Sequence, residues 1–256
     1  MKRFMKILSL GAAVLMLAGS LAACSGKPGA GLDLISEGKL VMGTNAFFPP
    51  FEYKEGGEVV GVDVDIVKAI AEKLDLTFEV KGDIEFHSLP ESLKAKDIDL
   101  IAAGFTARAD REEAMDFSDS YATGIQSIIV PNDSDIASPD DLAGKKIGTQ
   151  RGTTGYIYCS DDFGDDAVVA YDNGLTAVQA LNNGQVDAVV IDNAPAKEYV
   201  AANPGLKVLD TSYAEEDYAI GMAKGSSLEA AVNAALEELK ADGTLQAIVD
   251  KYITAE

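Results

Sequence analysis

The chain has 256 residues, and its 42 acidic side chains outnumber 21 basic ones to give a net charge of -21. A nucleic-acid partner is not expected, because phosphates bind proteins mainly through lysine and arginine. The same charge favours solubility and opposes non-specific adhesion to anionic lipid.

Residues 1–23 are predicted to be a targeting segment. Lys2, Arg3 and Lys6 precede an uncharged run that ends in small residues, which is the order of a bacterial export signal. Leu21-Ala22-Ala23-Cys24 matches the bacterial lipobox, and that resemblance implies a lipid on Cys24 as the first mature residue. A plain N-terminal membrane helix is the alternative, although the apolar run is at the short limit for a span.

Residues 24–37 are interpreted as the lipidated cysteine and a flexible linker. Without the signal, the chain keeps 18 of its 21 basic residues against 42 acidic ones, for a net charge of -24. Residence at a membrane would then come from the lipid on Cys24. Cys159 is the other cysteine, so no intramolecular disulfide is expected and the core must hold the fold.

The remaining chain alternates strand-like apolar runs with amphipathic helical patterns, which predicts an α/β fold with mostly parallel sheets. The expected helices begin after Asp63, near Leu89, at Leu175, at Asn193, near Ser226 and at Thr244. The expected strands cover residues 39–43, 77–80, 99–103, 126–130, 146–149, 168–170, 188–191, 206–209 and 219–223.

Two βα series predict two lobes. Residues 38–122 with 219–256 are expected to form lobe 1, and residues 126–214 lobe 2. Residues 123–125 and 215–218 are expected to cross between the lobes, because this part of the chain is not a Pro- or Gly-rich linker. Two crossings predict a hinge with a cleft beneath it.

Ligands of open α/β sheets bind beyond the carboxyl ends of the strands. Four expected strand ends are rich in polar or aromatic residues. They carry Thr44, Asn45, Phe47, Phe48, Pro49, Pro50, Phe51 and Glu52; Gly104, Thr106 and Arg111; Gln150, Arg151, Gly152, Thr153 and Thr154; and Asp192.

Each group also has a simpler explanation. Phe48 could be an ordinary core residue. Thr153 and Thr154 could only start a helix, although such a start also offers backbone N–H groups to an anion. Asp192 could be only a helix cap.

Taken together, the four strand ends complement a free α-amino acid. Arg111 and the N–H groups suit a carboxylate, Asp192 suits an ammonium group, and the aromatic residues suit a side chain. Burying each charge of a zwitterion costs several kcal/mol unless it is paired. Charge-assisted hydrogen bonds of roughly 1.5–3 kcal/mol each would offset that cost.

Six sequence blocks, in this order, resemble the polar-amino-acid solute-binding proteins of ATP-driven importers, the bacterial extracellular solute-binding protein family 3. This family includes glutamine-, histidine- and arginine-binding proteins. The blocks begin at Gly43, Gly61, Ile98, Asp141, Ala180 and Leu239.

The resemblance implies a two-lobed, periplasmic-binding-protein-like fold of type II with two crossing hinge strands. It further implies a monomer without enzymatic activity, cofactor or metal, which holds an amino acid in the cleft and delivers it to a membrane permease. The protein would be extracytoplasmic, with its lipid on the outer face of the bacterial cytoplasmic membrane.

The resemblance also assigns ten residues to the ligand. Arg111 falls on the family's carboxylate-binding arginine, and its five-residue spacing to Asp116 selects it over Arg108. Thr106 and Gly104 are implied to hold carboxylate and ammonium from lobe 1. From lobe 2, the resemblance implies that Thr154 and Thr153 bind the carboxylate and that Asp192 binds the ammonium group. It places Phe48 and Phe86 as aromatic walls around the side chain, and Asn45 and Gln150 at polar positions that contribute to selectivity.

Departures from the family pattern leave the ligand open between polar and basic amino acids. Asn45 stands where many relatives have aspartate, which removes a charge that favours a cationic side chain. Arg108 and Arg151 could favour a polar or acidic ligand if they point inward. In contrast, the block from Asp192 to Asn203 most resembles basic-amino-acid binders.

Two other functions are alternatives for this sequence. A cyclohexadienyl dehydratase-like enzyme on the same fold needs an acid or base in the cleft, and Glu52 and His87 are the only candidates. A ligand-sensing module is usually fused to a membrane helix and a signalling domain, and neither is recognised in this sequence.

Overall fold

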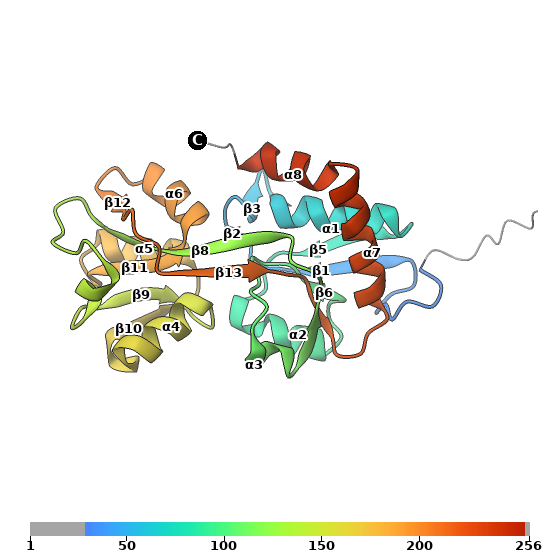
Figure 1. The fold of residues 1–256 in the computed structure, drawn as a ribbon, viewed down its shortest axis with the longest axis horizontal. Helices are drawn as coiled ribbons and strands as arrows, with labels where there is room; N and C mark the ends of the chain where they lie inside the picture. The colour runs from blue at the N-terminus through green and yellow to red at the C-terminus, as the bar shows by residue number, and fades with distance from the viewer. Residues whose placement is uncertain (1–28, 254–256) are drawn as a thin grey trace, which may run out of the picture.

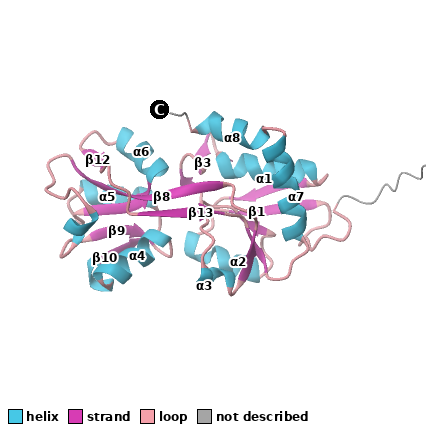
Figure 2. Ribbon diagram, in the orientation of Figure 1, coloured by secondary structure: helices cyan, strands magenta, loops and turns pink. Residues whose placement is uncertain are grey.

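The computed structural model describes residues 29–253 of the chain. Two main sheets lie end to end, and helices surround both of them (Figure 1). Strands β8 (Ala122–Pro131) and β13 (Ala214–Tyr218) are antiparallel neighbours that run between the two sheets. Helices and strands alternate in both halves (Figure 2), so the predicted α/β architecture is confirmed.

The first sheet has five strands in the order β5 (Thr77–Lys81), β1 (Lys39–Gly43), β6 (Leu100–Ile101), β14 (Gly221–Ala223) and β7 (Met115–Phe117). β1 is parallel to β5 and β6, whereas β14 is antiparallel to β6 and β7.

Helices cover both faces of the first sheet. α1 (Val62–Lys73), α7 (Leu228–Ala241) and α8 (Thr244–Tyr252) pack together on one face, and α2 (Leu89–Lys94) packs on the other. Successive strand side chains point to opposite faces. Leu40 therefore joins the core beneath α1, while Val41 joins the core beneath α2.

The second sheet contains the strands β10 (Val168–Tyr171), β9 (Ile147–Gln150), β11 (Ala188–Asp192), β8 and β12 (Leu206–Val208), with β13 also paired to β8. β9 is parallel to β10 and β11, and β8 is antiparallel to β11. Three helices contact this sheet, namely α4 (Thr154–Phe163), α5 (Gly174–Asn182) and α6 (Asn193–Ala201). Alternate residues of β11 again join separate cores, with Val190 beside Cys159 of α4 and Val189 beside Val178 of α5.

The nine strands expected from sequence all appear within residues 29–253, several with shifted ends. The second expected crossing, residues 215–218, lies in β13. The sequence patterns did not predict the small sheet of β2 (Phe47–Phe48), β3 (Glu52–Glu55) and β4 (Glu58–Val60), nor β7. These strands have two to four residues, too few to show a two-residue hydrophobic period.

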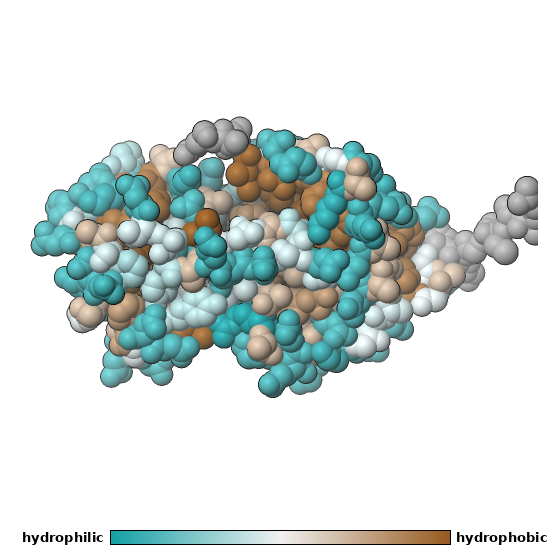
Figure 3. Space-filling view, in the orientation of Figure 1, coloured by the Kyte–Doolittle hydropathy of each residue, from teal (hydrophilic) through white to brown (hydrophobic). Residues whose placement is uncertain are grey.

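The predictions for the targeting segment and for Cys24 fall outside the described residues. Residues 29–37 contact the first half of the molecule, since Asp33 and Ser227 exchange hydrogen bonds of 2.9 Å and the Ile35 N–H donates to Asp99. None of the helices in residues 29–253 is long and apolar enough to cross a membrane. Hydrophilic side chains spread over both halves of the face in Figure 3, as a chain with 25% charged residues predicts.

Candidate functional site

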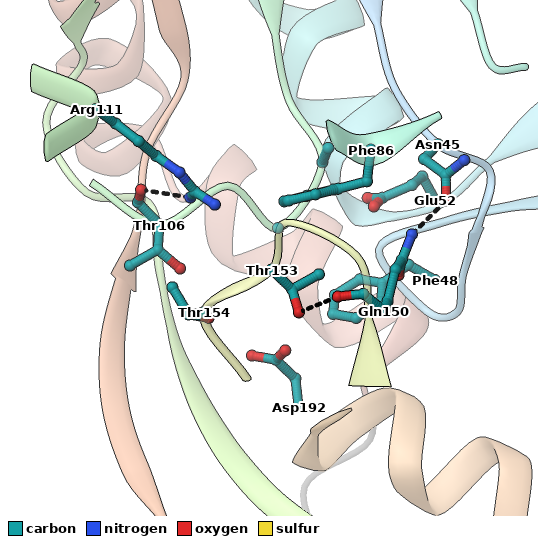
Figure 4. Close-up of a pocket in the computed structure, with 12 residues that line it drawn as sticks. Asn45, Phe48, Glu52, Phe86, Thr106, Arg111, Gln150, Thr153, Thr154 and Asp192 are labelled. Carbon is teal, nitrogen blue, oxygen red and sulfur yellow. Dashed lines mark hydrogen bonds between the residues drawn. The ribbon is translucent and has the colours of Figure 1, made fainter. Parts of the chain in front are cut away.

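All ten residues assigned to the ligand line one pocket where the two halves of the chain meet (Figure 4). Ala103 and Glu52 complete its lining. The ten are Asn45, Phe48, Phe86, Gly104, Thr106, Arg111, Gln150, Thr153, Thr154 and Asp192.

The pocket lies at the carboxyl ends of four strands. Asn45 follows β1, Thr106 follows β6, Gln150 ends β9 and Asp192 ends β11. Parallel strands end at a common edge of their sheet, which is why residues distant in sequence meet here.

Gly104 makes room for an aromatic wall. Its φ is +52°, a left-handed conformation, and a Cβ at this position would lie 2.7 Å from Cε1 of Phe48. Glycine tolerates both conditions, whereas any larger residue would displace Phe48 from the pocket. The Gly104 N–H donates to Asp63 Oδ2 at 2.8 Å.

Arg111 lies on the short helix α3 (Ala109–Glu112) and extends into the pocket (Figure 4). It donates to the carbonyl oxygen of Thr106 at 2.9 Å and to that of Gly152 at 3.1 Å, so it contacts both halves of the molecule. Its Cζ lies 4.0 Å from the ring centroid of Phe105. Burial lowers the pKa of Arg111 to about 10, which leaves it cationic at neutral pH.

Among the described residues, no carboxylate forms an ion pair with Arg111. Two carbonyl oxygens accept only part of its five-donor capacity. The guanidinium group therefore retains both charge and N–H groups for an anion in the pocket.

Three backbone N–H groups lie at or beside the pocket lining, since Thr106 and Thr154 line the pocket and Gly155 follows Thr154. α4 begins at Thr154, after the N-cap residue Thr153, whose hydroxyl accepts from the Tyr156 N–H. Within residues 29–253, the N–H groups of Thr154, Gly155 and Thr106 have no hydrogen-bond acceptor. A helix N-terminus with open N–H groups favours an anion.

Asp192 occupies the N-cap position of α6 but makes no capping hydrogen bond through its side chain. Its carboxylate instead accepts from Gln126 Nε2 at 2.8 Å and from the Tyr218 hydroxyl. Burial raises the pKa of Asp192 to about 7, and the charge of Glu216 adds to this rise. The simple capping explanation therefore does not account for this side chain.

Glu216 was not identified from sequence. It lies on β13, 6% exposed, and its Oε2 accepts from Thr154 Oγ1 at 2.7 Å, from Gln126 Nε2 at 3.0 Å and from Thr106 Oγ1 at 3.3 Å. A hydroxyl has one proton to donate, so while these bonds persist the two threonines can offer a bound anion only their backbone N–H groups.

Gln126 and Tyr218 were also missed. The Gln126 amide bridges the carboxylates of Asp192 and Glu216, and Tyr218 lies two residues after Glu216 on the same face of β13. A polar side chain at a buried position of an apolar strand was the available signal for Gln126.

The opposite side of the pocket is formed by Asn45, Phe48, Glu52 and Gln150 (Figure 4). We call this group the far end, and we call Thr106, Arg111, Thr154 and Asp192 the clamp end. The Asn45 amide is already engaged, because Nδ2 donates to the Ile84 carbonyl and Oδ1 accepts from Gln150 Nε2 at 3.0 Å.

Arg108, Arg151 and His87 do not line the pocket. Arg108 borders a neighbouring hollow, where it donates to Asp110 at 2.8 Å and lies 5.4 Å from the ring centroid of Tyr158. Arg151 and His87 are exposed. Arg108 and Arg151 would favour a polar or acidic ligand only if they pointed into the pocket, and neither lines it.

Known proteins share both the sequence and the fold. The chain is 36% identical over 228 residues to the arginine-binding extracellular protein ArtP of Bacillus subtilis (strain 168), covering 85% of this chain and 87% of the relative. It is 32% identical over 223 residues to the ABC transporter arginine-binding protein 1 of Escherichia coli (strain K12), covering 84% of this chain and 90% of the relative.

Among solved structures, the arginine-, lysine-, histidine-binding protein ArtJ of Geobacillus stearothermophilus superposes with a TM-score of 0.81 at 37% identity. The match covers 85% of this chain and 96% of that one. The likeness confirms the expected two-lobed fold of type II. Residues 40–255 match the model of the bacterial extracellular solute-binding proteins, family 3, and the chain belongs to this family.

Proposed function

We propose that the pocket captures a free α-amino acid with a polar or cationic side chain, for delivery to the membrane permease of an ABC importer. The observation that carries this proposal is the presence of Arg111 and Asp192, a cation and a carboxylate, in one buried pocket. Relatives named as arginine-binding proteins, one of them of an ABC transporter, support it.

The ligand carboxylate binds at the clamp end. Arg111 supplies a cation from lobe 1, and the N–H groups of Thr154 and Gly155 supply donors from lobe 2. Contacts from both lobes to one ligand favour the arrangement in which the lobes are together.

The ligand ammonium group binds Asp192. Its two oxygens already accept from Tyr218 and Gln126, which hold the carboxylate in place, and each oxygen retains a second lone pair. The nearby charge of Glu216 adds to the attraction for a cation.

The side chain extends to the far end, between the rings of Phe48 and Phe86. Acidic groups outnumber the guanidinium group at the pocket. Asp192 and Glu52 line it beside Arg111, and the buried Glu216 and Asp63 accept hydrogen bonds from its lining residues Thr154 and Gly104. Aromatic faces and an excess of acidic groups suit a cationic side chain better than a neutral one.

Residues 38–122 with 219–256 and residues 126–214 act as two lobes, with 123–125 and 215–218 as the hinge. The antiparallel pairing of β8 with β13 supports this division. The dehydratase alternative lacks support, because His87 is exposed and Glu52 faces Asp63 rather than a relay.

Lipid on Cys24 tethers the protein, as a monomer, to the outer face of the cytoplasmic membrane. The lipobox Leu21-Ala22-Ala23-Cys24 supports this step. Cys24→Ala should move the expressed protein from the membrane pellet to the soluble fraction, and an unchanged pellet fraction would refute the lipid anchor.

A thermal-shift panel tests the binding function. Ligand at 100 times its dissociation constant should add roughly 2.7 kcal/mol of stability. For a chain of this size, that corresponds to a rise in Tm of about 5–10 °C. Absence of a shift with every common amino acid, on folded protein shown to be free of ligand, would refute the proposal.

A further inference from the structure

Two buried acids meet behind the far end of the pocket. Glu52 begins β3 and lines the pocket, and Asp63 lies in the first turn of α1; each is only 1% exposed. One oxygen of each, Glu52 Oε2 and Asp63 Oδ1, is buried without a donor from any other group in residues 29–253. The two residues are neighbours, because the Asp63 N–H donates to the carbonyl oxygen of Phe51, the residue before Glu52, at 3.0 Å.

The two neighbouring acids can satisfy these oxygens by a hydrogen bond to each other only if one of them carries a proton, because a carboxylate can only accept. Asp63 is the better anion of the two. Its Oδ2 accepts from the Gly104 N–H at 2.8 Å and from the Tyr121 hydroxyl at 2.7 Å, and it lies at a helix N-terminus.

Glu52 is the better acid. Burial, followed by the charge of Asp63, raises its pKa well above the usual range. Burial also raises the pKa of Asp63, to about 6, against the opposing hydrogen bonds from Gly104 and Tyr121. The proton therefore resides mainly on Glu52.

The groups that face Glu52 from neighbouring elements supply no compensating cation. Asp63 acts on it from α1, Asp192 from the end of β11, Tyr121 from the segment before β8 and Tyr199 from α6. The cation that lines the same pocket, Arg111, is at the clamp end, bonded to the carbonyl oxygens of Thr106 and Gly152.

We propose that Glu52 and Asp63 hold one proton between them, and that a cationic ligand side chain binds Glu52 by displacing this proton. The inference rests on the amino-acid function proposed above. The carboxylic acid of Glu52 becomes a carboxylate paired with the ligand cation, and the proton passes to the solvent. A neutral side chain leaves the proton in place, shared between Glu52 and Asp63.

Proton release predicts how discrimination depends on pH. Affinity for a cationic ligand should rise with pH, by up to tenfold per unit while the acid pair remains protonated. Asp192 also becomes more ionised over this range, but it contacts the ammonium group of every amino acid. Its contribution therefore cancels when a cationic ligand is compared with a neutral one.

L-arginine and L-citrulline are the matched probes, because the neutral ureido group of citrulline has nearly the shape of guanidinium. Isothermal titration calorimetry of the full chain at pH 7, in buffers of different ionisation enthalpy, counts the protons released with each. Arginine should release close to one proton more than citrulline.

Glu52→Gln, which keeps the shape but cannot titrate, should abolish this difference. The ratio of arginine to citrulline affinity in the unaltered protein, followed from pH 5.5 to 8, provides the same test without a variant. It should rise with pH.

Equal proton counts for both ligands, together with a ratio independent of pH, would overturn the displacement while leaving amino-acid binding intact. Failure of both probes and of all common amino acids to bind would overturn the proposed function, and this inference with it. Binding of citrulline but not arginine would overturn both the displacement and the preference for a cation, while leaving amino-acid binding intact.

Discussion

At the clamp end, the carboxylates of Asp192 and Glu216 accept hydrogen bonds from neutral donors, and the Gln126 amide bridges them. At the far end, one oxygen of Glu52 and one of the neighbouring Asp63 are buried without a hydrogen-bond donor in residues 29–253. The first arrangement holds two acidic side chains in a defined geometry. The second stores a proton that can leave when a cation arrives.

The two ends also contact different parts of the proposed ligand. The clamp end faces the carboxylate and ammonium groups that all α-amino acids share, whereas the far end faces the side chain. Changes at the clamp end should therefore alter affinity for all amino acids alike, and changes at the far end should alter their ranking.

Arg111→Ala should have the largest effect. Loss of the buried cation leaves the ligand carboxylate without its charged partner, at a cost of about 2–5 kcal/mol, or at least about 30-fold in affinity. Calorimetry should show a similar loss for arginine and citrulline. Arg111→Lys keeps the charge without the planar fork and should restore only part of the affinity. A loss confined to arginine would contradict the clamp assignment.

Asp192→Asn should remove the part of the pH dependence of folding stability that comes from titration of Asp192. Burial raises the folded-state pKa of Asp192 from 3.8 to about 7, so the folded protein binds this proton more tightly than the unfolded chain does. Proton binding by Asp192 therefore stabilises the folded protein at low pH, and this stabilisation is lost as pH rises from about 4 to about 7.

Relative to the unaltered protein, Asp192→Asn should accordingly gain up to about 4 kcal/mol of unfolding free energy between pH 4 and pH 8. Urea unfolding of ligand-free protein at several pH values measures this change. Parallel pH curves for the two proteins would show that Asp192 does not titrate in this window.

Phe48→Leu should affect ranking at the far end. Leucine retains apolar contact but has no aromatic face for a cation, which is worth about 1 kcal/mol. Arginine affinity should fall about fivefold, and citrulline affinity less. Phe48→Tyr retains the ring and should preserve the ranking. An equal loss for both ligands in Phe48→Leu would indicate simple packing.

Arg108→Ala should have the smallest effect. Arg108 borders the hollow beside the pocket and contacts Tyr158, so its removal should change both affinities by less than about 0.5 kcal/mol. Arg151→Ala, at an exposed position, is the matched control. A selective gain for arginine in Arg108→Ala alone would mean that Arg108 reaches the ligand side chain.

Much of the site could be predicted from chain order because it lies at strand ends. Arg111 follows an apolar strand of the first sheet and Asp192 ends one of the second, and both strands are clear in the sequence. Within each sheet, parallel strands bring their carboxyl ends to one edge. Whether these residues bind the ligand remains a prediction, although they line one pocket.

Glu216 could not be found in this way. It belongs to the five-residue strand β13, whose pairing with β8 places Glu216 opposite Gly124. Hydrophobic period does not specify which of two neighbouring acidic residues, Glu215 or Glu216, turns inward on so short a strand. The structure buries Glu216 and exposes Glu215.

The sequence by itself determined the α/β class, the order of the main strands and the residues that follow them, because these depend on local hydrophobic period and on chain order. Only the tertiary structure decided which buried acids lie together. In the sequence, Asp63 is indistinguishable from any other acidic residue in the first turn of a helix. Its proximity to Glu52 arises from the packing of α1 against β3. Electrostatic coupling depends on separation in space and on burial, and neither follows from position along the chain.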